Sequence, residues 1–217
     1  RDDGSTAETP VLVNLFGTVE RVAWGLGVAR PRLGELGELL AALRELEPID
    51  DLRGALQRWP LLKAAFATIP VNVSRPPVQE KMHIGAQADL GRLPIQVCWP
   101  GEPAPLVTWP LVITRPPGHD RTLAYNMGVY RMQVLGPNRA IVRWLSHRGG
   151  AAHHRLWAAE GHDMPVAVVI GADPATMLSA VLPLPEGMSE LRFSGLLRGE
   201  RPRLARCQTV PLMIRAV

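Results

Sequence analysis

The sequence predicts an α+β protein in which an N-terminal α/β region precedes a mainly β domain. Before residue 90 the clearest pattern is helical, because leucines recur at three- and four-residue spacing over 33–46. From residue 93 onward, short runs of β-forming residues alternate with prolines and glycines. The length of 217 residues is enough for one large or two small cores. We therefore expect an N-terminal region with a linker over 1–90 and a second domain over 91–217.

The first expected elements form a strand, a turn and a helix. Residues 9–15 read as a short buried strand, and the following helix has Thr18 as N-cap and Glu20 in its first turn. Gly25 or Gly27 is expected to end it. Because a glycine-rich phosphate-binding pattern is absent from this sequence, we interpret the unit as structural.

Further along, the pattern predicts an amphipathic helix over 33–46 and short helices at 50–58 and 60–66. Residues 70–92 read as a linker in which 79–84 is a candidate strand. In the second half, short strands are expected at 95–99, 106–109, 111–115, 165–170 and 204–209.

Two helices are expected among these later strands, one at 153–160 and one at 174–181. Asp173 has the residue type of an N-cap, and Pro174 suits the first helical position. Residues 187–195 read as a loop that continues into a strand. His153 and its neighbour His154 are expected on the surface of their helix.

A β-hairpin is the strongest local prediction. The runs 129–135 and 139–145 flank the turn residues 136–138, Gly-Pro-Asn. With all three residues in the loop, Leu135 pairs with Arg139, and Arg131 falls opposite Arg143. Because like charges directly opposite are destabilising, an anion between or beside the two guanidinium groups is expected.

Composition narrows the class of protein. The net charge is +4 with a pI of about 9.7, but the arginines are spread among acids, so we expect no nucleic-acid partner. No apolar run approaches the roughly 20 residues of a membrane span, and no signal peptide is visible. The isolated Cys98 and Cys207 suit a reducing cytoplasm. Because the chain begins with Arg1, we expect a missing upstream segment.

Several ordered motifs resemble the UbiD family of prenylated-FMN-dependent decarboxylases. The most specific are Asn126-x-Gly128-x-Tyr130-Arg131 and the octet RWLSHRGG at 143–150. Similar motifs lie at 14–18, 93–95, 98–100, 171–176, 189–190 and 195–199. The resemblance covers nearly the whole chain. It implies that the second domain is a split β-barrel, incomplete here, that binds prenylated FMN.

The resemblance also implies residue roles. Asn126, His147 and Glu190 match metal ligands that hold the flavin phosphate through Mn²⁺, and these donor types suit that ion. Potassium would sit near the backbone of Ser179, Ala180 and Leu182. Arg131 matches the catalytic arginine. The flavin-contacting positions are Val129, Tyr130, Arg131, Arg143, Trp144, Leu145, Arg148 and Gly149, although Trp144 equally suits the core. Arg198 and Gly199 read as a strand-end turn.

The implied activity is the non-oxidative decarboxylation of 4-hydroxy-3-polyprenylbenzoate in ubiquinone biosynthesis. Another aromatic or α,β-unsaturated acid is the alternative substrate, and a non-catalytic flavin- or phosphate-binding module is the alternative class. A flavin prenyltransferase would supply the cofactor, and the full-length protein would be a homo-oligomer in the cytoplasm, with at most peripheral contact to the inner membrane. Family members are longer, with catalytic carboxylates that would lie beyond Val217, so we expect an inactive fragment.

Overall fold

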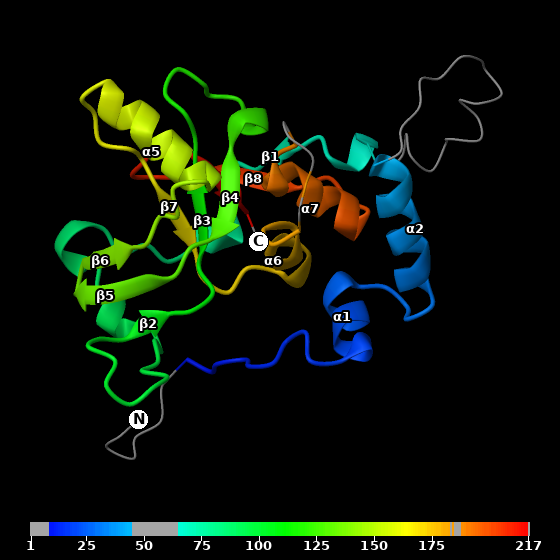
Figure 1. Ribbon diagram of the computed structural model, residues 1–217, viewed down its shortest axis with the longest axis horizontal. Coiled ribbons are helices and arrows are strands. Elements are labelled where there is room, and N and C mark those ends of the chain that lie inside the picture. The colour runs from blue at the N-terminus through cyan, green and yellow to red at the C-terminus, as the bar shows by residue number, and fades with distance from the viewer. Residues whose placement is uncertain (1–8, 45–64, 183, 185–187, 217) are drawn as a thin grey trace.

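The computed structural model describes residues 9–44, 65–182, 184 and 188–216. These described residues form a mixed α/β structure with three three-stranded sheets. In Figure 1 the sheet β2-β5-β6 lies at the left, helices α1 and α2 lie at the right, and α6 and α7 lie between them and the central strands. None of the described helices is long and apolar enough to cross a membrane.

The N-terminal segment contains one confirmed helix and one wrong strand. Helix α1 (Val19–Leu26) begins as expected, because the Thr18 side chain accepts a hydrogen bond from the Arg21 amide at 3.2 Å. It ends at Gly27, which adopts the left-handed conformation with φ of 70°. Residues 9–15 form no strand, and Leu12 is 76% exposed. A strand needs a neighbour for its backbone hydrogen bonds, and 9–15 has none among the described residues.

Helix α2 (Arg32–Arg44) confirms the helical prediction up to residue 44. The expected helix at 50–58, and the one at 60–66 up to residue 64, lie outside the described residues. The candidate strands 79–84 and 95–99 are wrong, since neither segment contains a strand. The linker instead carries short 3-10 helices: η1 (Pro77–Gln79), η2 (Gly85–Gln87) and η3 (Leu90–Arg92).

The central sheet has the order β4-β3-β7 and is antiparallel throughout. Its middle strand β3 (Leu111–Thr114) is buried at every position, which is why its sequence LVIT is continuous rather than alternating. The neighbours are β4 (Asn126–Val129), which follows η4 (Thr122–Ala124), and β7 (Ala167–Val169). Helix α5 (Gly149–Ala159) packs on β3 and β4 and starts four residues earlier than expected.

The second sheet contains the predicted hairpin. Strand β2 (Leu106–Val107) pairs with β5 (Met132–Gly136), which pairs with β6 (Arg139–Val142). The predicted register is confirmed from Met132, which lies opposite Val142, to Val134, which lies opposite Ala140. The predicted pair of Leu135 with Arg139 is wrong, because a bulge after Val134 pairs Gly136 with Arg139 and leaves a two-residue turn. Arg131 and Arg143 lie just outside the ladder.

The first hairpin strand starts later than predicted because the segment 126–136 belongs to two sheets. Residues 126–129 pair with β3, and residues 132–136 pair with β2 and β6. Tyr130 and Arg131 are the two residues of the crossing. Strands that pass from one sheet to another do so at such bends.

The third sheet has the order β1-β8-β9. Strand β1 (Val71–Asn72) runs parallel to β8 (Arg203–Arg206), and β9 (Met213–Arg215), which was not predicted, runs antiparallel to it. A strand from before residue 90 therefore pairs with one from after it, and the boundary at 90 stays a prediction.

Of the expected loop and strand at 187–195, residue 187 lies outside the described residues and 188–189 form a loop. The expected strand is wrong, because α7 (Glu190–Arg198) is a helix. Arg198 and Gly199 consequently end a helix rather than a strand, and Gly199 has a φ of 74°. The helix is buried on most sides, so its apolar residues lack the one-sided spacing that identifies a surface helix. It packs against α6 (Pro174–Ser179), and the two share an apolar cluster with α1.

Candidate functional site

One cavity of about 1090 Å³ gathers most of the predicted site residues. It is bordered by β4, the crossing residues, the segment 143–149, the end of α6 and the start of α7. The predicted residues that line it are Asn126, Val129, Tyr130, Arg131, Arg143, Leu145, His147, Arg148, Gly149 and Glu190. Trp144 does not line the cavity; its ring lies 4.7 Å from that of Tyr130, centroid to centroid.

The cavity lies where strands end and the chain changes direction. Strand β4 stops at Val129, and the segment 143–148 leaves the hairpin to enter α5. A Cβ atom at Gly149 would collide with the Asn126 side-chain oxygen, so the first turn of α5 can approach β4 this closely only with glycine there. The motif glycine is therefore required by packing at the cavity wall.

The charge on the cavity wall suits an anion. Arg131, Arg143 and Arg148 line it together with His147, whereas Glu190 is the one acidic residue among the lining residues. The N-terminus of α5 begins at Gly149, and the preceding Arg148 provides no side-chain cap. Phosphate oxygens accept hydrogen bonds from guanidinium groups and from backbone N–H groups at the start of a helix.

Glu190 occupies the first position of α7, which brings a carboxylate to β4. Its Oε2 accepts a hydrogen bond from the Met127 amide at 3.0 Å. Burial raises the pKa of the Glu190 carboxyl, and the hydrogen bond from Met127 opposes that rise. A nearby cation would offset the cost of keeping this buried group ionised.

The predicted metal ligands fit a divalent ion chemically. Asn126, His147 and Glu190 all line the cavity and offer an amide oxygen, an imidazole and a carboxylate, which suit Mn²⁺. The described residues contain no group of three or more His, Cys, Asp and Glu side chains placed to hold a metal. The candidate set here combines one imidazole and one carboxylate with the amide of Asn126. For potassium, Ala180 and Leu182 line the cavity, while the buried Ser179 hydroxyl donates to the Thr176 carbonyl oxygen at 2.8 Å.

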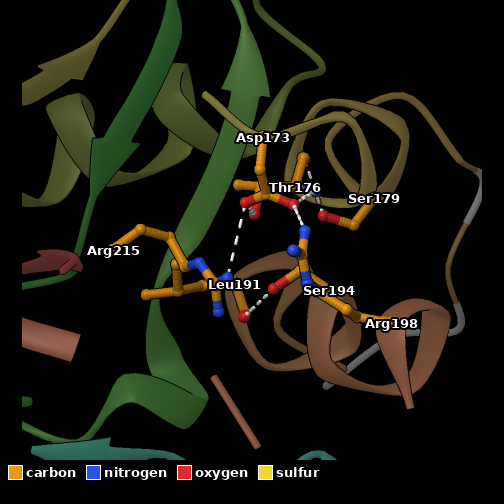
Figure 2. Close-up of polar contacts among 7 residues, drawn as sticks. All are labelled: Asp173, Thr176, Ser179, Leu191, Ser194, Arg198 and Arg215. Atoms are coloured by element: carbon orange, nitrogen blue, oxygen red, sulfur yellow. Dashed lines mark hydrogen bonds and ion pairs between the residues drawn. The ribbon is translucent and has the colours of Figure 1, made fainter. Parts of the chain in front are cut away.

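A partly buried ionic cluster anchors the two helices whose ends form one side of the cavity (Figure 2). Asp173 accepts a hydrogen bond from the Thr176 amide at 3.3 Å, as expected of an N-cap. Its carboxylate also pairs with Arg198 at 3.1 Å and with Arg215 at 3.5 Å. Asp173 thereby joins the start of α6, the end of α7 and β9.

Sequence reasoning missed two kinds of residue. Apolar side chains, including Val181, Leu184 and Met188, line the cavity without a motif to mark them. His153 is partly buried rather than fully on the surface: its Nδ1 lies 2.9 Å from the Thr114 hydroxyl, and burial lowers the pKa of its imidazole. No local sequence pattern marked it, because its partner lies on β3, 39 residues away. His154 is exposed, as expected.

Solved structures with the same fold are UbiD-class and related decarboxylases. Vanillic acid decarboxylase from Sedimentibacter hydroxybenzoicus in its closed form has a TM-score of 0.76 and 21% identity, over 98% of this chain and 42% of that one. The UbiD-class enzyme HmfF from Pelotomaculum thermopropionicum, in complex with FMN, has a TM-score of 0.73 and 25% identity, over 97% of this chain and 42% of that one. The 3,4-dihydroxybenzoic acid decarboxylase AroY from Klebsiella pneumoniae has a TM-score of 0.71 and 22% identity, over 95% of this chain and 39% of that one.

The fold is therefore that of the UbiD-class decarboxylases. The family model described as "UbiD: 3-octaprenyl-4-hydroxybenzoate carboxy-lyase Rift-related domain" matches residues 70–217, and the chain belongs to the UbiD family. The chain spans about two fifths of the length of the solved structures it resembles, 39% to 42%.

Proposed function

We propose that this chain forms the flavin- and metal-binding part of a decarboxylase that uses prenylated FMN to remove CO₂ non-oxidatively from an aromatic acid. The observation that carries the proposal is that one cavity is lined by three arginines together with His147, Asn126 and Glu190. A basic wall beside a buried carboxylate suits a phosphate held through a divalent cation. Membership of the UbiD family supports the same reading.

Prenylated FMN, when bound, supplies the electron sink that loss of CO₂ from an sp² carbon requires and that amino-acid side chains lack. The chain's own residues would bind the metal ion and the cofactor and orient them. Asn126, His147 and Glu190 would hold Mn²⁺ against the flavin phosphate, with K⁺ close to the backbone of Ser179, Ala180 and Leu182. Arg143, Arg148 and the start of α5 would donate to phosphate and ring-edge oxygens. Apolar residues such as Leu184 and Met188 would exclude water from the cavity.

Arg131 is the residue we assign to the substrate carboxylate. It lies at the crossing between two sheets, and Arg131 and Arg143 directly adjoin the paired residues Met132 and Val142. Both side chains line the cavity. Their mutual repulsion falls when an anion lies between them, so the pair favours a bound carboxylate or phosphate. A guanidinium in this place orients the acid and stabilises charge that shifts during reaction.

We propose 4-hydroxy-3-polyprenylbenzoate as the substrate, which places the protein in ubiquinone biosynthesis. The description of the matching family model and the form of the two central motifs support it. Another aromatic or α,β-unsaturated acid is the alternative, as AroY and vanillic acid decarboxylase act on smaller aromatic acids. Assaying a longer form of the protein on both substrate sizes separates the two.

The remaining parts of the proposal concern architecture and partners. We propose that the β-rich part is a split barrel, supported by the segment 126–136 that belongs to two sheets. The full-length protein would form homo-oligomers, would receive its cofactor from a flavin prenyltransferase and would work in the cytoplasm, at most peripherally at the inner membrane. One neighbour, HmfF, has been solved as an evolved dimer with prFMN.

Native mass spectrometry of the chain tests the site directly, after co-expression with a flavin prenyltransferase and Mn²⁺. The expected result is a mass increment for prenylated FMN plus metal. Arg143→Ala should weaken cofactor affinity at least about tenfold and so lower the bound fraction, because a charge-assisted contact contributes about 1.5–3 kcal/mol. Arg139→Ala is the matched control, since Arg139 is an exposed arginine on the same hairpin that does not line the cavity.

No increment in this chain and none in a longer form would remove the cofactor claim. A cofactor-loaded longer form that turns over neither substrate class would instead support the alternative of a non-catalytic flavin-binding module.

A further inference from the structure

The hydroxyl of Tyr130 joins the two sides of the cavity. It accepts a hydrogen bond from Asn126 Nδ2 at 3.3 Å and another from the Gly150 amide at 3.1 Å. Tyr130 is 8% exposed, so water competes little for these bonds. Asn126 is on β4, whereas Gly150 is in the first turn of α5. One oxygen atom therefore links a strand to the start of a helix.

The bond to Gly150 acts as a helix cap from outside the helix. The first backbone N–H groups of a helix have no partner within it, and the N-cap residue of α5 provides no side-chain bond. Tyr130 supplies an acceptor instead. His147 lies three residues before Gly150, so fixing the helix start also limits where His147 can lie.

Aromatic packing holds the Tyr130 ring in place. The ring lies 4.7 Å from that of Trp144, centroid to centroid, at an interplanar angle of 60°. A Cβ atom at Gly128 would come within 2.8 Å of the Tyr130 ring, and one at Gly150 would collide with the Trp144 ring. The two rings are thus packed against two glycines of the motifs, which leaves the hydroxyl little freedom to move.

We propose that Tyr130 is a positioning residue that sets the orientation of the Asn126 amide. Because Asn126 Nδ2 donates to the Tyr130 oxygen, Asn126 Oδ1 is left to coordinate a cation in the cavity that the residue lines. The reverse orientation would present an N–H donor to the cation. This inference rests on the proposed function, in which Asn126 is a metal ligand. Partners that orient ligands in this way typically affect metal affinity by about 10–100-fold.

The test is a titration of Mn²⁺ into the FMN-supplemented chain, followed by loss of the electron paramagnetic resonance signal of the free ion. Tyr130→Phe should weaken Mn²⁺ binding at least about tenfold. The matched control is Tyr125→Phe, which removes the other tyrosine hydroxyl of the chain. Tyr125 is also buried, at 4% exposed, but its oxygen accepts from the Met213 amide and it does not line the cavity. Tyr125→Phe should leave the Mn²⁺ affinity within about twofold of the wild type, while lowering thermal stability about as much as Tyr130→Phe does.

A second variant separates orientation from general damage. Asn126→Asp has two equivalent oxygens, so either can face the cation without an oriented amide. In that background Tyr130→Phe should cost much less Mn²⁺ affinity than in the wild type, a coupling that a double-mutant cycle measures. An equal loss in both backgrounds, or unchanged affinity in Tyr130→Phe itself, would overturn the positioning role.

The wild-type titration distinguishes this inference from the function on which it rests. Wild-type binding that Asn126→Ala weakens, together with an unaffected Tyr130→Phe, rejects only the role of Tyr130. A wild-type chain that fails to bind Mn²⁺ rejects the proposed metal site, and the positioning role with it.

Discussion

Glu190 allows the sharpest test of the cavity, because its buried carboxylate should stabilise or destabilise the fold depending on whether metal is present. Without metal, burial opposes the charged form and raises the pKa of the Glu190 carboxyl above 4.5. Between 4.5 and that raised pKa the folded state binds more protons than the unfolded state. The free energy of unfolding therefore falls as pH rises through this window, and the loss persists above it.

Two substitutions separate charge from hydrogen bonding. Glu190→Gln removes the charge but keeps an oxygen that can accept from the Met127 amide. Without metal at pH 8 we expect it to be at least as stable as the wild type. Glu190→Ala leaves the N–H of Met127, a residue 1% exposed, without its acceptor. That should cost about 1–3 kcal/mol.

Urea denaturation at pH 8 and pH 5, with and without Mn²⁺, measures these differences. At a Mn²⁺ concentration 100 times the dissociation constant, the wild type should gain about 2.7 kcal/mol, and Glu190→Gln should gain far less. Glu80→Gln, at an exposed carboxylate, should match the wild type in every condition. The reasoning would be refuted if, without metal at pH 8, Glu190→Gln were clearly less stable than the wild type. It would also be refuted if Mn²⁺ stabilised Glu190→Gln as much as it stabilises the wild type.

Three further outcomes are expected. Asp173→Ala should lower the free energy of unfolding by about 3 kcal/mol in urea denaturation, because it leaves the largely buried Arg215 guanidinium without its carboxylate. Burial lowers the pKa of His153, so the thermal stability of the protein should fall as pH drops below about 6.5, and His153→Gln should reduce that dependence. Gly149→Ala should weaken Mn²⁺ binding at least about tenfold through the collision at β4, whereas Gly34→Ala, with open space around it, should stabilise α2 by up to about 1 kcal/mol in thermal denaturation.

Matched variants check each expectation. Glu20→Ala breaks an exposed ion pair with Arg30 and should cost under about 1 kcal/mol; a loss equal to that of Asp173→Ala would contradict the argument from burial. His154→Gln, at an exposed site, should leave the pH profile unchanged. Unchanged Mn²⁺ affinity in Gly149→Ala would show that the close approach is not needed.

Local patterns predicted the hairpin and two helix starts well. The strand-forming runs on either side of Gly136-Pro137-Asn138 predicted the hairpin, and the pairing of Met132 with Val142 and of Val134 with Ala140 followed the expected register up to the bulge. Thr18 and Asp173 were predicted as N-caps because capping depends on residues within one turn. The candidate site was predicted from ordered motifs, and ten of those eleven residues line one cavity.

Predictions failed where contacts distant in sequence decide the structure. Helix α7 is surrounded by protein, so its pattern carries no one-sided period. Residues 9–15 have strand-forming side chains, yet a strand depends on a partner that propensity does not report. His153 gained its hydrogen-bond partner Thr114 from a strand 39 residues away. For Trp144, where both a flavin contact and a core position were open, the structure shows packing against Tyr130 outside the cavity lining.

The sequence by itself determined the residue types that form the basic wall, the capping of α1 and α6, and the register of β5 and β6, because each depends on neighbours close in the chain. Only the tertiary structure decided that the segment 126–136 divides between two sheets at Tyr130 and Arg131. It also decided that α7 carries Glu190 to the Met127 amide. Both arrangements arise because buried backbone groups and buried charged groups are costly without hydrogen-bond partners. Those partners lie far away in the sequence.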